Sequence, residues 1–436
     1  MPRASPRKRA SVNYNEDEPQ KSVASKAAAK VTSLAKKAVS KRKADSEEEP
    51  VARINGTKET KKRKTKAEKE EDAMPLAQRT VVATLQKGMH IGAHVSAAGG
   101  VQNAVTNALH IGANSFALFL KSQRKWDNPP LSDEAKDLFI SACKHHGYNA
   151  AEHAVPHGSY LVNLAQPDPA KADQAYKGFL DDLKRCEALG IKLYNFHPGT
   201  TGGEPRAEAI GRIASQLNKA HKETATVITL LENMAGAGNV IGNSWEDLRD
   251  IIELVEDKAR VGVCIDTCHA FAAGHDLRSP EAFSETMTAF NNIVGEKYLK
   301  AFHVNDSKAP FRSNRDLHAN IGTGFLGLRA FHNLMNHAPS AGKPMMLETP
   351  IDRKDDKGKT VEDKQVWADE IKLLERLVGM DADSKEFIQL EEELWRRGEG
   401  ERKRIQDQVD KKAEKDAKKG TRGKKKKGRA SDEDSD

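Results

Sequence analysis

The sequence is poor in cysteine, in aromatic residues and in long apolar runs. Its four cysteines are Cys143, Cys186, Cys264 and Cys268. Because they lack the spacing of a disulfide framework or a zinc knuckle, we expect them to be reduced thiols of an intracellular protein. No apolar stretch approaches the roughly 20 residues that a membrane-spanning helix needs. No apolar segment of the secretory type follows Met1. We therefore expect neither a membrane protein nor a secreted disulfide scaffold.

Both ends of the chain lack apolar periodicity. Residues 1–85 hold 21 basic and 12 acidic residues, whereas residues 381–436 hold 17 and 16. Such segments bury too little apolar surface to offset the entropy of ordering the chain. We expect a disordered basic N-terminal tail (1–85), a folded domain (86–380) and a charged, helical or disordered C-terminal tail (381–436). The folded domain has 33 basic and 36 acidic residues, so a nucleic-acid-binding surface on it must be local.

The N-terminal tail carries clusters of the kind that direct nuclear import. They are Arg7–Arg9, Lys41–Lys43 and Lys61–Lys64. The first 15 residues contain arginine and serine but no acid before Glu16, which leaves a mitochondrial signal open. A merely solvated tail is the alternative, and we favour nuclear localisation.

From Met89 onward, short apolar segments alternate with amphipathic ones. Strands are predicted at 89–94, 115–119, 148–153, 192–197, 226–232, 261–266, 299–304 and 344–348. Helices are predicted at 131–145, 173–189, 207–224, 245–257, 280–294, 326–338 and 367–377. Eight strands that alternate with helices favour an α/β fold, a parallel (β/α)8 TIM barrel, in which every strand ends at one face.

Metal-binding residue types recur where these predicted strands break into polar loops. They are His157, His197, Glu232, Asp266, His269, His303, Asp316, His318 and Glu348. Strand ends of a parallel barrel meet at one face, where active sites are built. Five histidines and four carboxylates suit several zinc ions better than magnesium. The pattern indicates a multi-metal hydrolase.

The case for a metal-ligand role differs from residue to residue when each is considered alone. Glu232 and Asp266 end apolar strands, where an unpaired carboxylate is costly, so a cation partner is favoured. His157 or His318 alone could be an ordinary loop histidine. His94 also ends a strand, and we interpret it as a pocket residue that orients a bound phosphate or water.

Residues 89–378 resemble the endonuclease IV family of zinc-dependent apurinic/apyrimidinic (AP) endonucleases, fungal members in particular. The stretches that carry the resemblance are HIGAHVSAAGG, FALFLKSQRKW, SYLVNLA, GVCIDTCHAFAAG, HVNDSK and LETP. The two tails lie outside it.

The resemblance implies three zinc ions per chain. His157 and His197 would hold the first, and Glu232 would bridge it to the second. Asp266, His303 and Glu348 would complete the second zinc site. His269, Asp316 and His318 would hold the third. Glu232 and Glu348 are the expected catalytic residues, because paired metals can activate a shared water and hold a phosphodiester.

The resemblance also implies the partner, double-stranded DNA with abasic sites or blocked 3′ ends, acted on by a monomer. Positions matching Arg124, Tyr160 and Leu161 would contact and distort the duplex. The expected reaction is cleavage 5′ to an abasic site, leaving a 3′ hydroxyl and a 5′ deoxyribose phosphate, together with cleaning of 3′ ends. Without the resemblance, Tyr160 and Leu161 are more simply read as loop packing.

Two other functions compete with this one. Related barrels that isomerise or epimerise sugars use glutamate, aspartate and histidine on comparable strands. Such an enzyme would not require the additional set His157, His197, His269, Asp316 and His318. A nucleic-acid-binding protein without catalysis is the third possibility, and the complete ligand set disfavours it.

Overall fold

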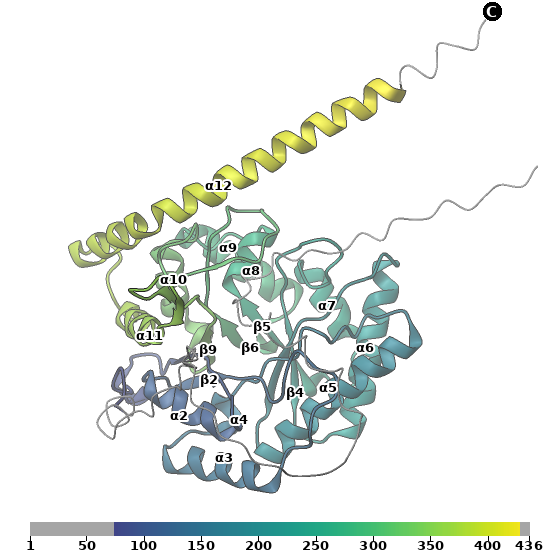
Figure 1. Cartoon of the computed structure of the whole chain (residues 1–436), viewed down its shortest axis with the longest axis vertical. Coiled ribbons are helices and arrows are strands. Elements are labelled where there is room, and N and C mark those ends of the chain that lie inside the picture. Colours follow the sequence, from purple (N-terminus) through teal and green to yellow (C-terminus); the bar gives the residue numbers. More distant parts are fainter. Residues whose placement is uncertain (1–73, 428–436) are drawn as a thin grey trace, which may run out of the picture. The chain divides into compact units, whose positions relative to one another are not determined.

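The computed structural model describes residues 74–427 (Figure 1). The import clusters predicted in the N-terminal tail lie outside these residues. Within them, no helix combines the length and the apolarity that crossing a membrane requires.

A parallel sheet forms the centre of the fold, in the order β2-β1-β9-β6-β5-β4-β3. Its strands are β1 His90–His94, β2 Ser115–Ala117, β3 Leu193–Phe196, β4 Ile228–Glu232, β5 Val261–Asp266, β6 Leu299–His303 and β9 Pro344–Leu347. Residues 154–158 close the gap between β2 and β3: Val155 N donates to Phe116 O at 3.0 Å, and Asn195 N donates to Pro156 O at 2.9 Å. The predicted TIM barrel is confirmed, and this short extended segment occupies the position of its eighth strand.

The strand predicted at 148–153 is wrong in position. Residues Ala150–His153 form the short helix α4, because the side chain of Asn149 accepts a hydrogen bond from Ala151 N and caps the helix. The extended backbone begins only at Ala154. A local cap therefore overrides the strand propensity of the segment.

Helices connect the strands, and two more follow the last strand of the sheet. They are α2 Gln102–His110, α3 Asp133–His145, α5 Pro169–Leu189, α6 Arg206–Glu223, α7 Trp245–Leu254, α8 Thr267–Ala273, α9 Pro280–Ile293, α10 Leu328–Asn336, α11 Gln365–Leu377 and α12 Lys385–Lys427. Single turns of 3-10 helix are η2 Val82–Thr84, η3 Lys258–Arg260, η4 Glu296–Tyr298 and η5 Ala338–Ser340. Side-chain caps start several of the helices, as where Asp168 accepts from Lys171 N and Pro169 follows it in the first turn.

Two short strand pairs lie outside the barrel sheet. β7 Asp306–Ser307 pairs antiparallel with β8 His318–Ala319 in the connection that follows β6. β10 Asp352–Lys354 and β11 Thr360–Glu362 form an exposed hairpin.

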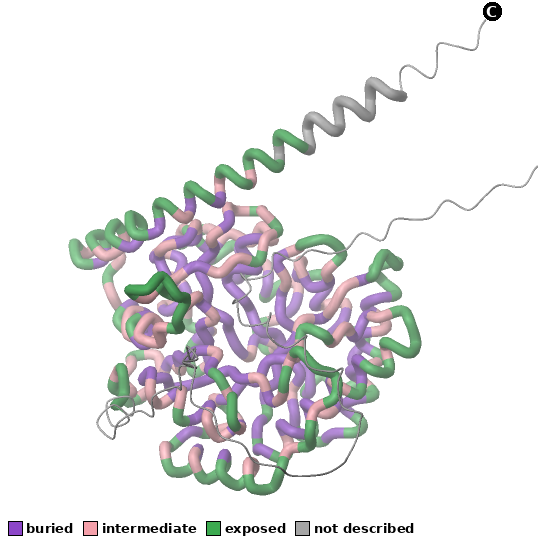
Figure 2. The backbone as a smooth tube through the Cα atoms, viewed as in Figure 1, coloured by how far each residue is buried: buried purple, intermediate pink, exposed green. Residues whose placement is uncertain are grey.

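Buried apolar side chains form two clusters. In Figure 2 the buried residues are concentrated in the centre of the fold. The larger cluster lies between the strands and the surrounding helices. The smaller one is a layer inside the barrel, made of Ala117, Val155, Leu193, Leu230, Cys264, Ala301 and Met346. All four cysteines are buried free thiols.

The described chain contacts the barrel before residue 86. Arg79 Nε donates to Asn114 Oδ1 at 2.8 Å, and Thr80 Oγ1 donates to Glu375 Oε2 at 2.7 Å. The boundary expected at residue 85 therefore falls inside a segment that is held by side-chain hydrogen bonds.

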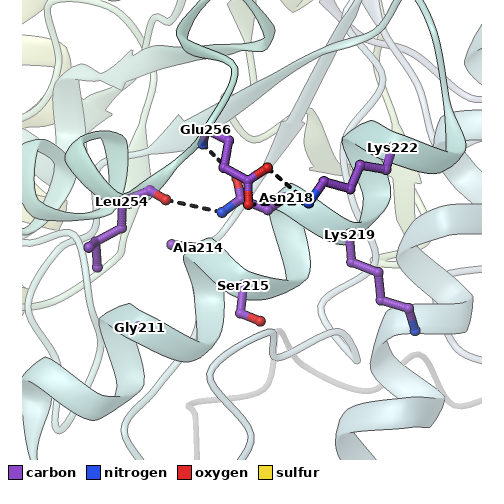
Figure 3. A pocket seen from close by; sticks show the side chains of 8 residues that line it. All are labelled: Gly211, Ala214, Ser215, Asn218, Lys219, Lys222, Leu254 and Glu256. Atoms are coloured by element: carbon purple, nitrogen blue, oxygen red, sulfur yellow. Dashed lines mark hydrogen bonds and ion pairs between the residues drawn. The ribbon is translucent and has the colours of Figure 1, made fainter.

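A shallow groove of about 460 Å³ lies between α6 and α7 (Figure 3). Its lining includes Asn218, Lys222 and Glu256, near the helix ends that lead back into the next strands. This position is opposite to the strand ends that carry the candidate ligands, and none of those ligands lines the groove.

Candidate metal centre

The strand pleat places five candidate ligands in one ring. Because side chains alternate across a strand, the residue two positions after an inward apolar residue also points inward. Val155, Leu230, Cys264, Ala301 and Met346 belong to the inner apolar layer. Two positions later come His157, Glu232, Asp266, His303 and Glu348. The ligand ring is therefore the next layer of the barrel interior, at the C-terminal ends of the strands.

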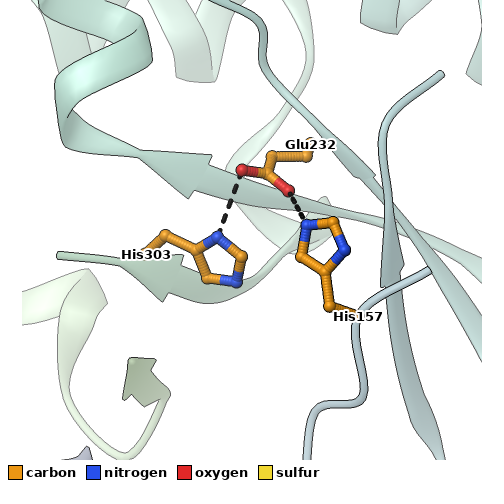
Figure 4. Close-up of side chains that lie close together, drawn as sticks. All are labelled: His157, Glu232 and His303. Carbon is orange, nitrogen blue, oxygen red and sulfur yellow. Dashed lines mark hydrogen bonds and ion pairs between the residues drawn. The ribbon is translucent and has the colours of Figure 1, made fainter. Parts of the chain in front are cut away.

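Glu232 lies at the centre of this ring and is fully buried. Its Oε2 lies 3.2 Å from His157 Nε2 and 3.4 Å from His197 Nε2. Its Oε1 lies 3.1 Å from His303 Nδ1 (Figure 4) and 3.4 Å from His269 Nδ1. The two carboxylate oxygens thus face different histidines, which is the geometry that a bridging ligand needs.

A second group surrounds His303. Its Nδ1 lies 3.2 Å from Glu348 Oε2 and 4.0 Å from Asp266 Oδ2. Candidate ligand atoms of Glu232, Asp266, His303 and Glu348 all lie within 4.8 Å of one another. His94 contacts the same group, with Nδ1 3.0 Å from Glu348 Oε1, so it orients a carboxylate of the site.

A third group comes from loops rather than from the strands. His269 lies in α8, which begins directly after Asp266, and its Nε2 lies 3.1 Å from Asp316 Oδ2. His318 Nε2 lies 3.0 Å from Asp316 Oδ1. The structure therefore brings His269, Asp316 and His318 together, as predicted from the resemblance.

Three histidines are oriented by backbone carbonyls. The Nδ1 atoms of His157, His269 and His318 lie 2.7, 2.9 and 3.3 Å from Gly158 O, Asn233 O and Glu348 O. A ring whose Nδ1–H donates to a carbonyl presents a lone pair at Nε2, the usual state of a metal ligand. The Nε2 atoms of His269 and His318 are buried and both face the carboxylate of Asp316, at 3.1 and 3.0 Å. This donor set fits metal ions.

The charges of the group shift its pKa values strongly. Burial raises the pKa of Glu232, but the neighbouring His303 and His197 outweigh it and hold that pKa well below its usual value. Burial lowers the pKa of His318, yet Asp316 raises it to about 9. A fully buried anion is stable only with cationic partners, which protons supply here and which metal ions would supply when bound.

Buried asparagines orient the carboxylates, and sequence reasoning missed them. Asn195 Nδ2 donates to Glu232 Oε2 at 2.5 Å, and Asn305 Nδ2 donates to Asp266 Oδ2 at 2.7 Å. Asn233 Oδ1 accepts from Asp266 N at 2.7 Å. Each asparagine stands beside or two residues from a ligand in YNFH, VND or LLEN. An amide inside an otherwise apolar strand end was the available signal.

The predicted DNA-contacting residues lie at the rim of this site. Tyr160 is 59% exposed, although its ring centroid is only 5.2 Å from that of His157. Leu161 is 38% exposed, and Arg124 is exposed on the loop after β2. An exposed aromatic side chain next to the ligands is available to a substrate.

Comparisons with known proteins agree with this geometry. A family model described as a xylose isomerase-like TIM barrel matches residues 105–377. Apurinic-apyrimidinic endonuclease 1 of Saccharomyces cerevisiae is 49% identical over 286 residues, which cover 66% of this chain and 75% of the yeast protein. Probable endonuclease 4 of Campylobacter curvus is 47% identical over 289 residues, 66% of this chain and 98% of that protein. The crystal structure of endonuclease IV from Thermus thermophilus has a TM-score of 0.56 and 27% identity, covering 66% of this chain and 99% of that one.

Proposed function

Because this chain belongs to the endonuclease IV family of AP endonucleases, we propose that it cleaves DNA 5′ to abasic sites with three zinc ions. The products are a 3′ hydroxyl and a 5′ deoxyribose phosphate, and blocked 3′ ends are a second substrate. The observation that carries the proposal is the buried Glu232, whose two oxygens face separate groups of histidines.

The three proposed zinc ions would be held by three sets of residues, two of which share Glu232. His157, His197 and Glu232 would hold the first; Glu232, Asp266, His303 and Glu348 the second; His269, Asp316 and His318 the third. Zinc bound there would supply a coordinated water of lowered pKa and a positive charge for the scissile phosphate.

The protein's own contribution is to position these groups. The Asn305 amide donates to the Asp266 carboxylate and accepts from Glu348 N at 2.8 Å, so one side chain links the Asp266 carboxylate to the backbone at Glu348. His94 fixes the other end of Glu348. Asn305 and His94 thus contact the proposed ligands and not the metal, and contacts of this kind tune metal affinity.

Substrate selection is assigned to the exposed rim. Tyr160 and Leu161 insert beside the abasic nucleotide, where a missing base lowers the cost of unstacking. Arg124 contacts the phosphate backbone. The basic N-terminal tail is assigned to nuclear import, and the site acts in a monomer.

A cleavage assay with paired duplexes tests the proposal. One duplex carries a single abasic site and the other an ordinary nucleotide at that position. We expect cleavage of the abasic strand alone, with 3′ ends that a polymerase extends. Chelation should abolish activity, and zinc without added magnesium should restore it, because histidine-rich sites prefer zinc. A requirement for millimolar magnesium contradicts the metal assignment, and sugar epimerisation without cleavage contradicts the function.

A further inference from the structure

The first half of α12 packs on the barrel, although it lies beyond residues 105–377 that the family model matches. Its buried residues are Phe387, Leu394, Gly398, Arg402 and Ile405. Their spacing follows one helix face. Phe387 contacts α10 through the ring of His332, at 5.1 Å between centroids.

The same face touches the turn that follows β8. A Cβ atom added to Gly398 would fall 1.8 Å from Thr323 O, so the helix backbone lies directly against this carbonyl. Arg402 Nη1 donates to Thr323 O at 2.6 Å. The guanidinium also lies 3.5 Å from the ring centroid of Trp395, which holds it in place. Gly398 and Arg402 together form the α12 contact with Thr323.

This turn supports the strand pair that carries His318. Gly324 N donates to Asp306 Oδ2 at 2.8 Å, and Phe325 N donates to Ser307 O at 2.7 Å. Ser307 is paired directly with His318 in β7–β8. Thr323 is therefore connected to a candidate ligand through a few hydrogen-bonded residues.

The connection after β6 is tied to the barrel by hydrogen bonds such as Asn314 N to Ala272 O at 3.0 Å and Ile321 N to Glu370 Oε1 at 2.7 Å, and parts of it are nevertheless strained or exposed. Arg312 and Asn314 have positive φ angles of 59° and 52°, a conformation that costs free energy for residues other than glycine. The Asp316 side chain is 48% exposed. The α12 contact with Thr323 adds a support from outside the barrel to those within it.

We propose that α12 is a positioning element of the active site: its contact with Thr323 holds the loop that presents Asp316 and His318 to the third metal. The proposal rests on the proposed function, and it assigns Gly398 and Arg402 as positioning residues that touch neither metal nor substrate.

Gly398→Ala and Gly400→Ala form a matched pair of variants in the full-length chain. Alanine is the better helix former at both positions, and nothing lies within 4 Å of a Cβ atom at Gly400. Only the alanine at position 398 meets Thr323 O. We expect zinc at one of three sites to bind roughly 10–100-fold more weakly in Gly398→Ala, the range for outer partners of metal ligands. Gly400→Ala should match the wild type.

Two readouts besides activity distinguish positioning from general stability. Elemental analysis after dialysis against a weak chelator should give two zinc ions in Gly398→Ala and three in the control. Hydrogen exchange should become faster at the amides of Ile321, Gly324 and Phe325, with the amides of β5 unchanged. Equal zinc content and equal exchange in the two variants would overturn the proposal. Loss of all zinc together with faster exchange in β5 would also overturn it, because α12 would then serve stability alone.

Two variants of Arg402 test the proposal independently. Arg402→Met removes the donor to Thr323 O, while Arg402→Lys keeps a cation that can reach it. We expect Met to reproduce the zinc loss and Lys to restore most of the occupancy; Arg396→Met, on an exposed part of the same helix, is the control. No zinc loss in Arg402→Met would contradict the proposal. Wild-type protein that holds fewer than three zinc ions, or leaves abasic DNA intact, refutes the proposed function instead, so the two failures are separable.

Discussion

The ligands around Glu232 and those around Asp316 are held in different ways. Glu232 and His303 are fully buried, end barrel strands and follow inner-layer residues by the strand period. Asp316 lies in a loop with its side chain 48% exposed, and His318 belongs to a two-residue strand. A sheet sets the position of its side chains through its own hydrogen bonds, whereas a loop ligand needs contacts from elsewhere. The geometry of the ligands around Glu232 should therefore depend on the barrel sheet, and the geometry of those around Asp316 on the segments that pack against their loop.

Replacing Glu232 gives the largest expected effect. Glu232→Gln removes a charge that faces four histidines, so cleavage of abasic DNA should fall by about 10³-fold, the upper end of the range for loss of an electrostatic stabiliser of a transition state. Zinc content should fall at the two sites that share this residue, while far-UV circular dichroism stays unchanged. The control is Glu246→Gln, on an exposed helix position. Near-normal turnover would show that the bridging assignment is wrong.

Replacing Asp316 tests whether the loop group is separable from the strand group. In Asp316→Asn we expect one zinc ion to be lost and two retained, with cleavage reduced by roughly 10²-fold. The melting temperature should hardly change, because the side chain is half exposed. Asp250→Asn, at a comparably exposed position in α7, is the control for loss of a surface charge. Loss of all three ions would mean that the two groups form one cooperative unit.

The strand-borne part of the site could be predicted from the sequence for a physical reason. A polar residue that ends an apolar strand is costly to bury without a partner. Glu232 and Asp266 can therefore each be recognised as a candidate ligand without reference to the other. The period of two residues then explains why His303 and Glu348 join them. The grouping of His269 with Asp316 and His318 came from the family resemblance, because a loop conformation has no comparable periodicity.

Other features could not be predicted, since the residues that form them do not look apolar. The packed face of α12 includes Gly398 and Arg402, and neither contributes to an apolar stripe, yet one allows close approach and the other donates to Thr323 O. The asparagines that orient the carboxylates give only an ambiguous signal in the sequence, because an amide suits a turn as well as a strand end. The strand predicted at 148–153 was wrong because the Asn149 cap starts α4 there.

Tyr160 extends the comparison from the ligands to the exposed rim. Tyr160→Ala should weaken binding of abasic duplex by roughly tenfold, about 1.4 kcal/mol, since an inserted side chain offsets part of the unstacking cost. Zinc content should be unaltered, because the residue is no ligand. Tyr298→Ala, before β6 at the opposite barrel end, is the control. A lowered melting temperature with unchanged preference for abasic over intact duplex would instead indicate loop packing against His157 and His197.

Replacing Arg124 has the smallest expected effect. The salt dependence of DNA binding in the variant distinguishes a phosphate contact from a structural role. Arg124→Ala should weaken binding of abasic and intact duplexes by a similar, few-fold factor, because a phosphate contact is independent of sequence. The slope of log Kobs against log salt should become shallower by about 0.9, the value for one neutralised phosphate. Lys222→Ala, in the groove between α6 and α7 where Lys222 pairs with Glu256, removes the same charge far from the strand ends and should leave the slope unchanged. Equal slopes for wild type and Arg124→Ala would exclude the phosphate contact and confine DNA recognition to the residues nearer the metals.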